Sequence, residues 1–508
     1  MNLLSSTSIF GFFTLMSRIL GYLRDILIAF FLGATIFADA FFVAFRLPNT
    51  FRRLFAEGAF NAAFIPSYTE VRIKSKKKGK IFADNVLSLL LLILIFIVTI
   101  VEIFTPYLVY IIAPGFIEND IKFNLAIELT RITFPFLLFV SLSSFFSGIL
   151  NSNNKFAAAA AAPIILNIIL ITSLITSYYL NFNFAKQLSY GVTLAGIVQL
   201  IFLFHVTLKF YQPSLLFKFK IDSKVKFFFK KLLPSILSSG VTQINILIGT
   251  IIASFESGAV SYLYYADRIY QINLAIAGIA VSTVSLPVLS KAFKNKNIKK
   301  LSNIQNKSFE LTLLLSIPAS FGLILASKEI VNALFGYGSF SKEDVQLTAD
   351  ALKYFGYGVP AFALIKILSN FFFARDNTKI PFYISAAIVV INISISVSLF
   401  SNFGFIIIPI ATSIATWIGV IIYIYLLNQN NFLLLKIRLI PNFLKILTST
   451  IIMSIILILA LNNYASYLDY TYKFKVIYLI SIVGFVGIVY LLSCYLLGIL
   501  KIKDYKTN

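Results

Sequence analysis

The side chains of this chain that could do chemistry are charged residues set in apolar sequence, and they gather in the first seventy residues. Two apolar stretches there, 8–31 and 36–66, together carry Arg18, Arg24, Asp25, Asp39, Arg46, Arg52, Arg53 and Glu57. A charge inside a membrane segment costs about 2.5–3.5 kcal/mol on insertion scales, so it usually faces a polar cavity or a partner. Arginine stays charged, and its planar fork binds phosphate through two hydrogen bonds. The pattern therefore favours a cationic cavity for an anionic, phosphorylated substrate.

Helical periodicity assigns these charges to faces. Arg18 and Asp25 are seven residues apart and share a face, whereas Arg24 points about 120° away. In the second half of the chain, Ser261 and Arg268 also share a face. Residues on one face of a span can line one wall of a cavity, so these positions are candidate site residues.

The second stretch has a charged stripe of its own. Asp39, Arg46 and Arg53 repeat every seven residues. Pro48 lies between them and can kink the helix, so the pattern leaves open whether Arg52 or Arg53 faces the cavity.

The acidic residues allow two interpretations. Asp25, Asp39 and Glu57 could neutralise arginines or form ion pairs that open and close. The alternative is that several of these charges reach the membrane surface or make purely structural pairs. That alternative weighs most for Arg46, Arg52, Arg53 and Glu57, because their segment approaches one membrane interface.

The composition is that of an integral membrane protein. Apolar residues make up 59% of the chain and charged residues only 12%, and the mean hydropathy is +0.90. Soluble domains average about 25% charged residues, so this chain has too little polar surface to cover a soluble globule. The net charge of +23 falls mostly between apolar stretches, where it sets topology, and nucleic-acid binding is not expected.

Fourteen stretches approach the length of about 20 residues that a spanning helix needs. They are 8–31, 36–66, 85–112, 125–150, 157–180, 187–208, 232–255, 261–290, 308–333, 348–373, 381–401, 405–428, 441–462 and 475–499. Loops on one side are basic, at 72–80, 218–231, 291–300, 436–438 and 501–503, whereas loops on the other side carry Glu118, Asp120, Glu343, Asp344 and Asp469. The positive-inside rule then places both termini in the cytoplasm.

The two halves of the chain resemble each other at an offset of about 220 residues. The segment 39–47 aligns with 261–269, and further matching pairs are Arg46 with Arg268, Pro135 with Pro360, and Asn167 with Asn392. Each repeat holds six spans, an even number, so the two lobes have the same orientation. Parallel repeats of this kind occur in transporters whose substrate site lies between the lobes.

The repeat predicts an all-α membrane protein of two six-helix lobes followed by two further helices. Its predicted parts are an N-terminal lobe at 1–210, a basic cytoplasmic linker at 211–231, a C-terminal lobe at 232–428, and the last two helices with a short tail at 429–508.

Several chemistries are not expected from this composition. Cys494 is the only cysteine and His205 the only histidine, which excludes an internal disulfide and a zinc cluster. A Ser-His-Asp arrangement could use only His205, which is predicted to lie at a helix end. No G-x-x-x-x-G-K-[ST] run is present, so no ATP site of that kind is expected. We expect neither a metal site nor a cofactor nor enzymatic activity.

The charged N-terminal block is similar to the signature of MurJ-type (MviN) flippases. The motifs that carry the resemblance are Ser17-Arg18-Ile-Leu-Gly21-Tyr-Leu-Arg24-Asp25, Gly33-Ala34, Asp39-Ala-Phe-Phe-Val-Ala-Phe-Arg46-Leu-Pro48-Asn49, Arg52-Arg53-Leu-Phe-Ala-Glu57-Gly58, Leu150-Asn151-Ser152, Tyr264-Tyr265-Ala266-Asp267-Arg268, Leu286-Pro287 and Phe373-Ala374-Arg375-Asp376-Asn377-Thr378-Lys379. The N-terminal block is long and specific, and the resemblance covers essentially the whole chain.

The resemblance implies the fold of the multidrug/oligosaccharidyl-lipid/polysaccharide exporter superfamily in the bacterial inner membrane. The implied activity is movement of lipid II, an undecaprenyl-diphosphate-linked disaccharide pentapeptide, from the cytoplasmic to the periplasmic leaflet. The residues that match the essential cavity positions of the family are Arg18, Arg24, Asp25, Asp39, Arg52, Ser261 and Arg268. The lipid tail is expected in a groove at the last two helices, 441–499, and proteins of cell-wall synthesis are candidate partners.

The chain departs from some relatives at three positions. Gln271 and Asn273 stand where some relatives have Glu and Pro, and Gly249 stands where some have an acid in the seventh span. Because no acid occurs from Pro234 to Phe255, sodium coupling through that site is not expected. Coupling to the membrane potential or to a monovalent cation stays open as the source of energy.

Two other functions compete with this interpretation. One is a related exporter that moves another polyprenyl-linked oligosaccharide or drugs. The other is a membrane enzyme such as a polyprenyl-phosphate glycosyltransferase or polymerase. Such an enzyme needs a large outer loop with catalytic carboxylates or a metal site, whereas the predicted outer loops here are short.

Overall fold

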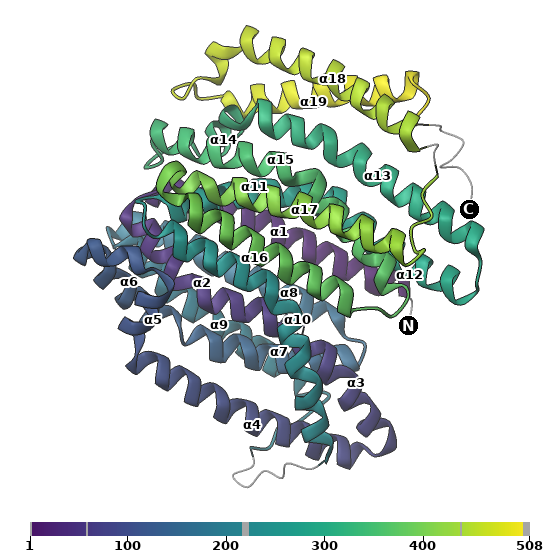
Figure 1. The fold of residues 1–508 in the computed structure, drawn as a ribbon. Coiled ribbons are helices and arrows are strands. Elements are labelled where there is room, and N and C mark those ends of the chain that lie inside the picture. The colour runs from purple at the N-terminus through teal and green to yellow at the C-terminus, as the bar shows by residue number, and fades with distance from the viewer. Residues whose placement is uncertain (1–2, 57–58, 216–222, 437–438, 501–508) are drawn as a thin grey trace. The chain divides into compact units, whose positions relative to one another are not determined.

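The computed structural model describes residues 3–56, 59–215, 223–436 and 439–500, and the secondary structure of this part of the chain is helical throughout (Figure 1). The chain divides into two compact units, residues 1–261 and 262–508. This division differs from the predicted lobes, because the helix at 223–253 falls in the first unit. The lobe boundaries near 210 and 232 therefore stay a prediction.

The first unit begins with two charged helices and ends at the start of α11. Its helices are α1 (Leu3–Leu32), α2 (Ile36–Ala56), α3 (Ala59–Lys74), α4 (Lys76–Ile103), α5 (Thr105–Ile112), α6 (Asp120–Thr133), α7 (Phe136–Ser152), α8 (Phe156–Leu180), α9 (Phe184–Thr207) and α10 (Ser223–Ala253). Helix α1 packs on α8, α2 packs on α6, and α10 packs on α3. Phe64 lies at the centre of an aromatic cluster that joins α3, α4, α7 and α10.

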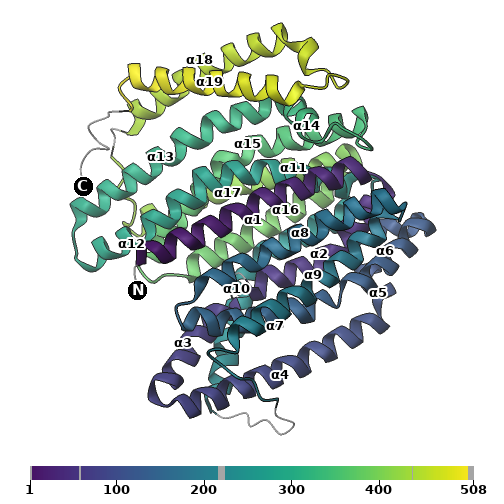
Figure 2. The same cartoon turned by 180° about the vertical axis from the view of Figure 1, so that it is seen from behind.

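The second unit contains most of α11 and all later helices. These are α11 (Ala259–Leu274), α12 (Val281–Lys294), α13 (Ile298–Leu325), α14 (Ser327–Phe335), α15 (Lys342–Phe373), α16 (Lys379–Phe403), α17 (Ile407–Gln429), α18 (Leu439–Asn463) and α19 (Lys475–Leu496). A π-helical segment, Ala275–Ala280, joins α11 to α12. Helices α18 and α19 pack together, with α18 against α13 and α19 against α14, as both views of the ribbon show (Figures 1 and 2).

Helix boundaries confirm the internal repeat. Helices α4 and α13 begin at Lys76 and Ile298, and α6 and α15 begin at Asp120 and Lys342, each pair separated by the same 222 residues. The pairs α8–α9 and α16–α17 pack alike within their own units, as do α7–α9 and α15–α17. The stretch predicted at 261–290 is confirmed as part of one apolar segment, Ala259–Lys294, in which a π-helical segment separates α11 from α12. The stretch predicted at 36–66 includes residues 57 and 58, which lie outside the described residues.

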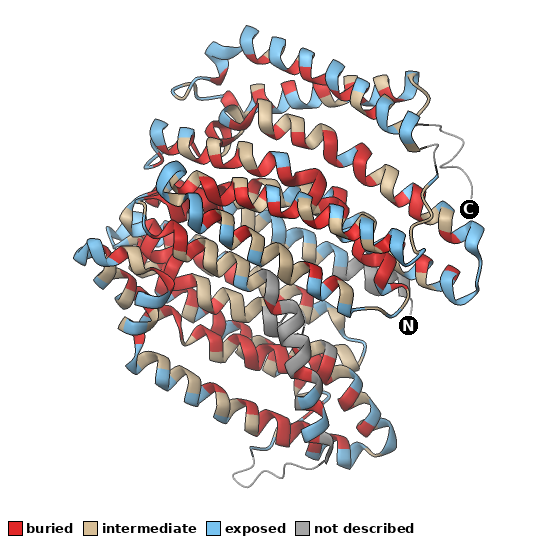
Figure 3. Ribbon diagram, in the orientation of Figure 1, coloured by how far each residue is buried: buried red, intermediate tan, exposed pale blue. Residues whose placement is uncertain are grey.

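The apolar surface of the helices indicates a bilayer environment. Large side chains such as Ile451, Ile455 and Leu491 are more than half exposed on α18 and α19, and exposed outer faces are evident on both helices in Figure 3. Within the described residues, ten segments are long and apolar enough to span a membrane. Helices α1 and α2 are not among these ten, and Lys379–Gln429 counts as one segment. The predicted number of fourteen spans therefore stays a prediction.

Candidate functional site

Arg24 and Asp25 form a buried ion pair on α1. Their side chains are 8% and 3% exposed. The Nε and Nη2 atoms of Arg24 both donate to Asp25 Oδ1, at 3.0 and 2.6 Å, and Nη1 donates to Asn167 Oδ1 on α8 at 2.9 Å. Asn167 in turn donates from Nδ2 to the carbonyl of Ser17 at 2.9 Å. The guanidinium is thus held between a carboxylate and an amide whose own orientation is fixed.

Gly21 lies beside this cluster, one turn before Asp25. A Cβ added there would meet the amide atoms of Asn167 at 3.5 and 3.6 Å, an ordinary contact distance. Arg18, which was predicted to share a face with Asp25, is exposed on α1. Arg24, predicted to point away from that face, instead contacts Asp25, because an arginine side chain is long enough to reach its neighbour around the helix.

Asp39 is the second charged centre of the first unit, and its side chain is fully buried. Its Oδ2 accepts from Lys122 Nζ at 2.6 Å and from the backbone N–H of Gly258 at 2.9 Å. Its Oδ1 accepts from the hydroxyl and the backbone N–H of Ser261, at 2.6 and 3.0 Å. One carboxylate therefore joins the starts of α2, α6 and α11.

Physical chemistry explains why a carboxylate is stable in this buried position. A buried charge needs an opposite charge and hydrogen bonds to offset desolvation, and Asp39 has four donors, one of which is the lysine ammonium. The N-terminus of α11 adds the positive end of a helix dipole. Gly258, at φ +79°, adopts the left-handed backbone that glycine tolerates best. The Lys122 ammonium also lies 4.1 Å from the ring centroid of Phe116.

The sequence interpretation missed two residues of these clusters. Lys122 has a side chain only 5% exposed, although its neighbourhood was assigned to an acidic outer loop. The sequence signal for a buried Lys122 was its position directly before an apolar stretch, on the side of the membrane whose loops carry few cations. Asn167 was noted only as a repeat match with Asn392, and its polar side chain within an apolar run was the signal for a buried contact.

The end of α2 carries the remaining charges of that helix. Arg52 and Arg53 are both half-buried, and Arg52 Nε donates to Asn49 Oδ1 at 3.1 Å. This leaves the choice between Arg52 and Arg53 as a cavity residue open. Glu57 lies outside the described residues.

Arg268 belongs to the second unit. It is half-buried on α11, donates from Nη2 to the hydroxyl of Tyr264 at 2.9 Å, and lies 4.7 Å from the centroid of that ring. The π-helical segment Ala275–Ala280 follows directly, and such segments frequently occur at functional sites. Because Arg268 and the N-terminal arginines lie in different units, their convergence on one cavity stays a prediction.

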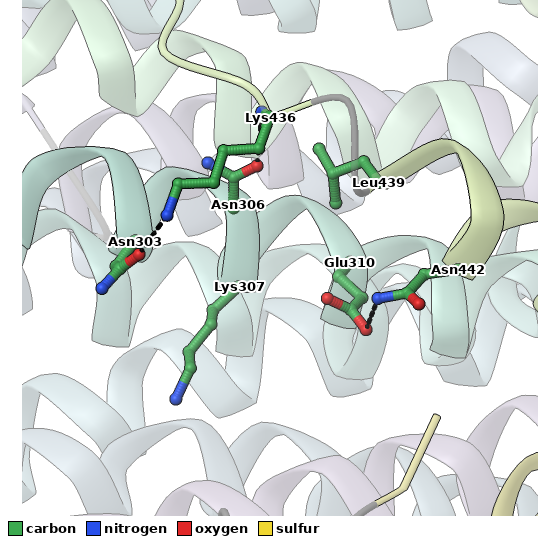
Figure 4. Close-up of a pocket in the computed structure, with 7 residues that line it drawn as sticks. All are labelled: Asn303, Asn306, Lys307, Glu310, Lys436, Leu439 and Asn442. Carbon is green, nitrogen blue, oxygen red and sulfur yellow. Dashed lines mark hydrogen bonds between the residues drawn. The ribbon is translucent and has the colours of Figure 1, made fainter. Parts of the chain in front are cut away.

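A small polar pocket lies elsewhere in the second unit, between α13 and the start of α18. It has a volume of about 260 Å³ and is lined by Asn303, Asn306, Lys307, Glu310, Lys436, Leu439 and Asn442. Lys436 Nζ donates to Asn303 and Asn442 Nδ2 donates to Glu310, both at 2.9 Å. Figure 4 shows Lys307 extending away from the others. The polar groups therefore pair with each other instead of converging on one point.

Metal ligands do not cluster in the part of the chain that the structure describes, where no group of three or more His, Cys, Asp and Glu side chains occurs. The site chemistry there is that of guanidinium, carboxylate, amide and hydroxyl groups. Such groups can bind an anion and exchange ion pairs.

Comparison with known proteins agrees with the resemblance that the charged helices and the repeat indicated. The family model of "Lipid II flippase MurJ" matches residues 28–479. A probable lipid II flippase of Rickettsia prowazekii is 39% identical over 486 residues, covering 95% of each chain. A probable lipid II flippase of Buchnera aphidicola subsp. Baizongia pistaciae is 35% identical over 515 residues, covering 100% of each chain.

Comparison with solved structures also points to the lipid II flippases. A lipid II flippase MurJ in an inward closed conformation has a TM-score of 0.82 and 28% identity, covering 96% of this chain and 98% of that one. An inward-facing MATE multidrug transporter has a TM-score of 0.66 at 17% identity, covering 82% of this chain and 94% of that one, which shows a shared fold. The chain is therefore a multi-pass bacterial inner-membrane protein that belongs to the MurJ family of lipid II flippases.

Proposed function

We propose that this lipid II flippase works by alternating access, taking the lipid-linked head group from the cytoplasmic leaflet and releasing it in the periplasmic leaflet. Both termini lie in the cytoplasm in this scheme. The distribution of lysine and arginine in the loops supports that orientation through the positive-inside rule. The repeated helices support the scheme, because two similar lobes can rock about a site between them.

The diphosphate of the substrate binds to arginine. The observation that carries this assignment is the Arg24–Asp25 pair, whose guanidinium is buried and oriented by Asn167. A phosphate oxygen offers the same bidentate partner as a carboxylate, so it can replace Asp25 on the fork of Arg24. Arg18, Arg52 and Arg268 supply the further positive charge, and the lipid tail stays in the bilayer beside α18 and α19.

The carboxylate of Asp39 closes the periplasmic side before substrate binds. It ties the starts of α2, α6 and α11 through Lys122 and Ser261, and these helix ends lie on the periplasmic side in the proposed orientation. Opening toward the periplasm then requires Asp39 and Ser261 to separate. Lys122 can remain with Asp39, because both belong to the N-terminal lobe.

Transport on this scheme forms and breaks no covalent bond, so the protein acts as a transporter without a cofactor. The membrane potential supplies about 2.3 kcal/mol per charge per 100 mV, and the absence of an acid from Pro234 to Phe255 argues against a carboxylate cation site there. Enzymes that synthesise and polymerise lipid II are the candidate partners on the two membrane faces.

Translocation of labelled lipid II in proteoliposomes tests the proposal. Wild type is compared with Arg24→Ala, Arg268→Ala and the control Arg131→Ala, which removes an exposed arginine of α6. We expect wild type and the control to flip lipid II and both site variants to lose most of the rate. Normal rates for both site variants would refute the arginine assignment, and an inactive wild type that is folded and correctly inserted would refute the flippase mechanism.

A further inference from the structure

The segment that follows α9 is fastened to α4 by one buried carboxylate. Asp84 Oδ1 accepts from the hydroxyl of Tyr211 at 2.5 Å and from the backbone N–H of Ser214 at 3.0 Å. Asp84 and Tyr211 are each only 4% exposed. Ser214 lies seven residues after the end of α9, the last helix of the first repeat. This contact therefore fixes the first exit, which is the segment that follows α9.

The second repeat holds its exit in the same way. Asn306 of α13 accepts at Oδ1 from the backbone N–H of Lys436 at 2.8 Å and donates from Nδ2 to the carbonyl of Leu434 at 2.9 Å. Figure 4 shows Asn306 directly beside Lys436. The segment here leads from α17 to α18. Asp84 and Asn306 are separated by the repeat offset of 222 residues, as are Ser214 and Lys436.

Neighbouring side chains reinforce the second exit. Gln305 accepts from the backbone N–H of Leu434 and donates to the carbonyl of Phe432, both at 2.9 Å, and Ser302 donates to the carbonyl of Leu434 at 2.8 Å. An irregular segment at the edge of a membrane must have its backbone groups satisfied by protein or water. Here α13 supplies the partners.

We propose that Asp84 and Asn306 are equivalent positioning residues: Asp84 clamps the chain after α9 onto α4, and Asn306 clamps the chain after α17 onto α13, so that each exit moves with its own repeat during lipid II transport. The inference rests on the alternating-access cycle proposed above. The first clamp sets where the linker to α10 starts, and the second sets where the chain to α18 starts.

The clamps stay closed while the lobes move. Each clamp joins elements of a single compact unit: α4 with Ser214 in the first, and α13 with Lys436 in the second. Relative motion of the two units therefore does not require either clamp to part. A released exit would add slack to the connection from α9 to α10 or from α17 to α18, so the helix that follows would be held less firmly to its own unit.

The chemistry of the two clamps differs in one testable respect. Asp84 only accepts hydrogen bonds, so asparagine can keep both contacts through its own Oδ1, although an uncharged acceptor makes them weaker. Asn306 also donates, to the carbonyls of Leu434 and Ser302. Aspartate there would lose both donors and place a negative carboxylate against two carbonyl oxygens. Exchange between the repeats should therefore be tolerated in one direction only.

The hydroxyl of Tyr211 stays protonated and donates a hydrogen bond to Asp84 in the first clamp. Burial, followed by its hydrogen bond to Asp84, raises the pKa of Tyr211 well above the usual range for a phenol. The hydroxyl therefore remains protonated at any pH used for transport or proteolysis. Changes in clamp behaviour near neutral pH cannot then be attributed to loss of this proton.

Trypsin provides a reporter at each exit, because Lys218 and Lys220 follow Ser214 in the sequence, and Arg438 follows Lys436, whose backbone is held by the second clamp. The full-length protein in nanodiscs is digested briefly, and the fragments are assigned by mass spectrometry. We expect Asp84→Ala to speed cleavage at the first exit about 10-fold, as loss of a hydrogen bond to a charged group implies, and to leave the second exit unchanged. Asn306→Ala and Asn306→Asp should speed cleavage at the second exit and leave the first exit unchanged. The exposed control Lys307→Ala should match wild type at both exits, and Asp84→Asn should stay close to wild type.

Lipid II translocation by the same samples gives the functional readout. Asp84→Ala and Asn306→Ala should flip lipid II several-fold more slowly, with Asp84→Asn near wild type. Unchanged cleavage in both alanine variants, or Asp84→Asn behaving like Asp84→Ala, would overturn the proposal. Faster cleavage at both exits would indicate general unfolding instead of clamp release and would also overturn it. An inactive wild type would count against the transport mechanism, whereas the cleavage pattern would still judge the clamps.

Discussion

Asp39 and Ser261 occupy matching positions of the internal repeat and are hydrogen-bonded to each other, with the Ser261 hydroxyl 2.6 Å from Asp39 Oδ1. The contact joins the start of α2 to the start of its counterpart α11, residues 222 positions apart in sequence. Because the equivalent positions hold an aspartate and a serine, the first repeat can accept the hydrogen bonds that the second repeat donates. Two aspartates there would repel, and two serines would leave Lys122 without a counter-charge.

Removing the charge of Asp39 should separate the helix ends that it joins. Asp39→Ala leaves the buried Lys122 unpaired, and breaking one partner of a buried ion pair costs about 3–5 kcal/mol. We expect a lower melting temperature in detergent and greater labelling of a cysteine placed at the buried Ala259, at the start of α11, in a Cys494→Ser background. The milder Ser261→Ala removes one hydrogen bond and should increase labelling with little loss of stability. Equal labelling of all three proteins would contradict the gating role of Asp39.

Substitution of Arg24 by lysine should fail although the charge is kept. The guanidinium contacts Asp25 and Asn167 at the same time, and a lysine ammonium lacks the planar fork that does so. We expect Arg24→Lys to bind lipid II at least about 10-fold more weakly, consistent with about 1.4 kcal/mol for a lost charge-assisted contact. Native mass spectrometry of lipid II complexes measures this, with Arg131→Lys as the matched control. Wild-type affinity of Arg24→Lys would show that charge alone suffices.

Asn167 should act through Arg24, because it holds the guanidinium and is itself held by Ser17. Asn167→Leu removes the amide and should lower lipid II affinity in the same direction as Arg24→Lys. The double variant Arg24→Lys/Asn167→Leu should be little worse than either single change, since both act on one contact. Additive losses measured in a double-mutant cycle would mean that Asn167 acts independently.

Tyr264 should support Arg268 mainly through its ring. The guanidinium lies 4.7 Å from the ring centroid and donates to the hydroxyl at 2.9 Å. Tyr264→Phe keeps the aromatic face, whose attraction to a cation is about 0.5–1 kcal/mol at an exposed site, so transport should fall less than about threefold. Tyr264→Leu loses both contacts and should lower transport further. If the phenylalanine and leucine variants transport equally, the ring has no part in positioning Arg268.

Lys475 should be important for stability without a role in binding. Its buried ammonium donates to Asn332 Oδ1, the carbonyl of Gly336 and the carbonyl of Tyr470, at 3.0, 2.7 and 2.8 Å, which joins α19 to α14. Lys475→Met leaves three buried acceptors without this donor, at about 1–3 kcal/mol each. We expect a melting temperature lower by several degrees, whereas the exposed Lys473→Met should be neutral. Equal melting temperatures would show that the ammonium contributes nothing.

The sequence by itself determined the class of protein, the repeat and most of the helices. Long apolar runs in lipid have to be helical, because every backbone group must be satisfied within the segment. The offset of 222 residues between Asp39 and Ser261 could also be read from the sequence, because equivalent helices of the two repeats keep the same spacing. Nomination of Arg24 and Asp25 as site residues also followed from sequence, because charge in an apolar span is costly and therefore rarely incidental.

Only the tertiary structure decided which side chains meet. Periodicity treats a side chain as a fixed direction, so it assigned Arg24 and Asp25 to different faces, although a flexible arginine reaches its neighbour. Lys122 and Asn167 contact partners 83 and 143 residues away, and no local spacing encodes such a contact. The same is true of Asp84 with Ser214 and Asn306 with Lys436: the exits are fixed by buried hydrogen bonds between distant segments, and these form only once the helices of each repeat have packed.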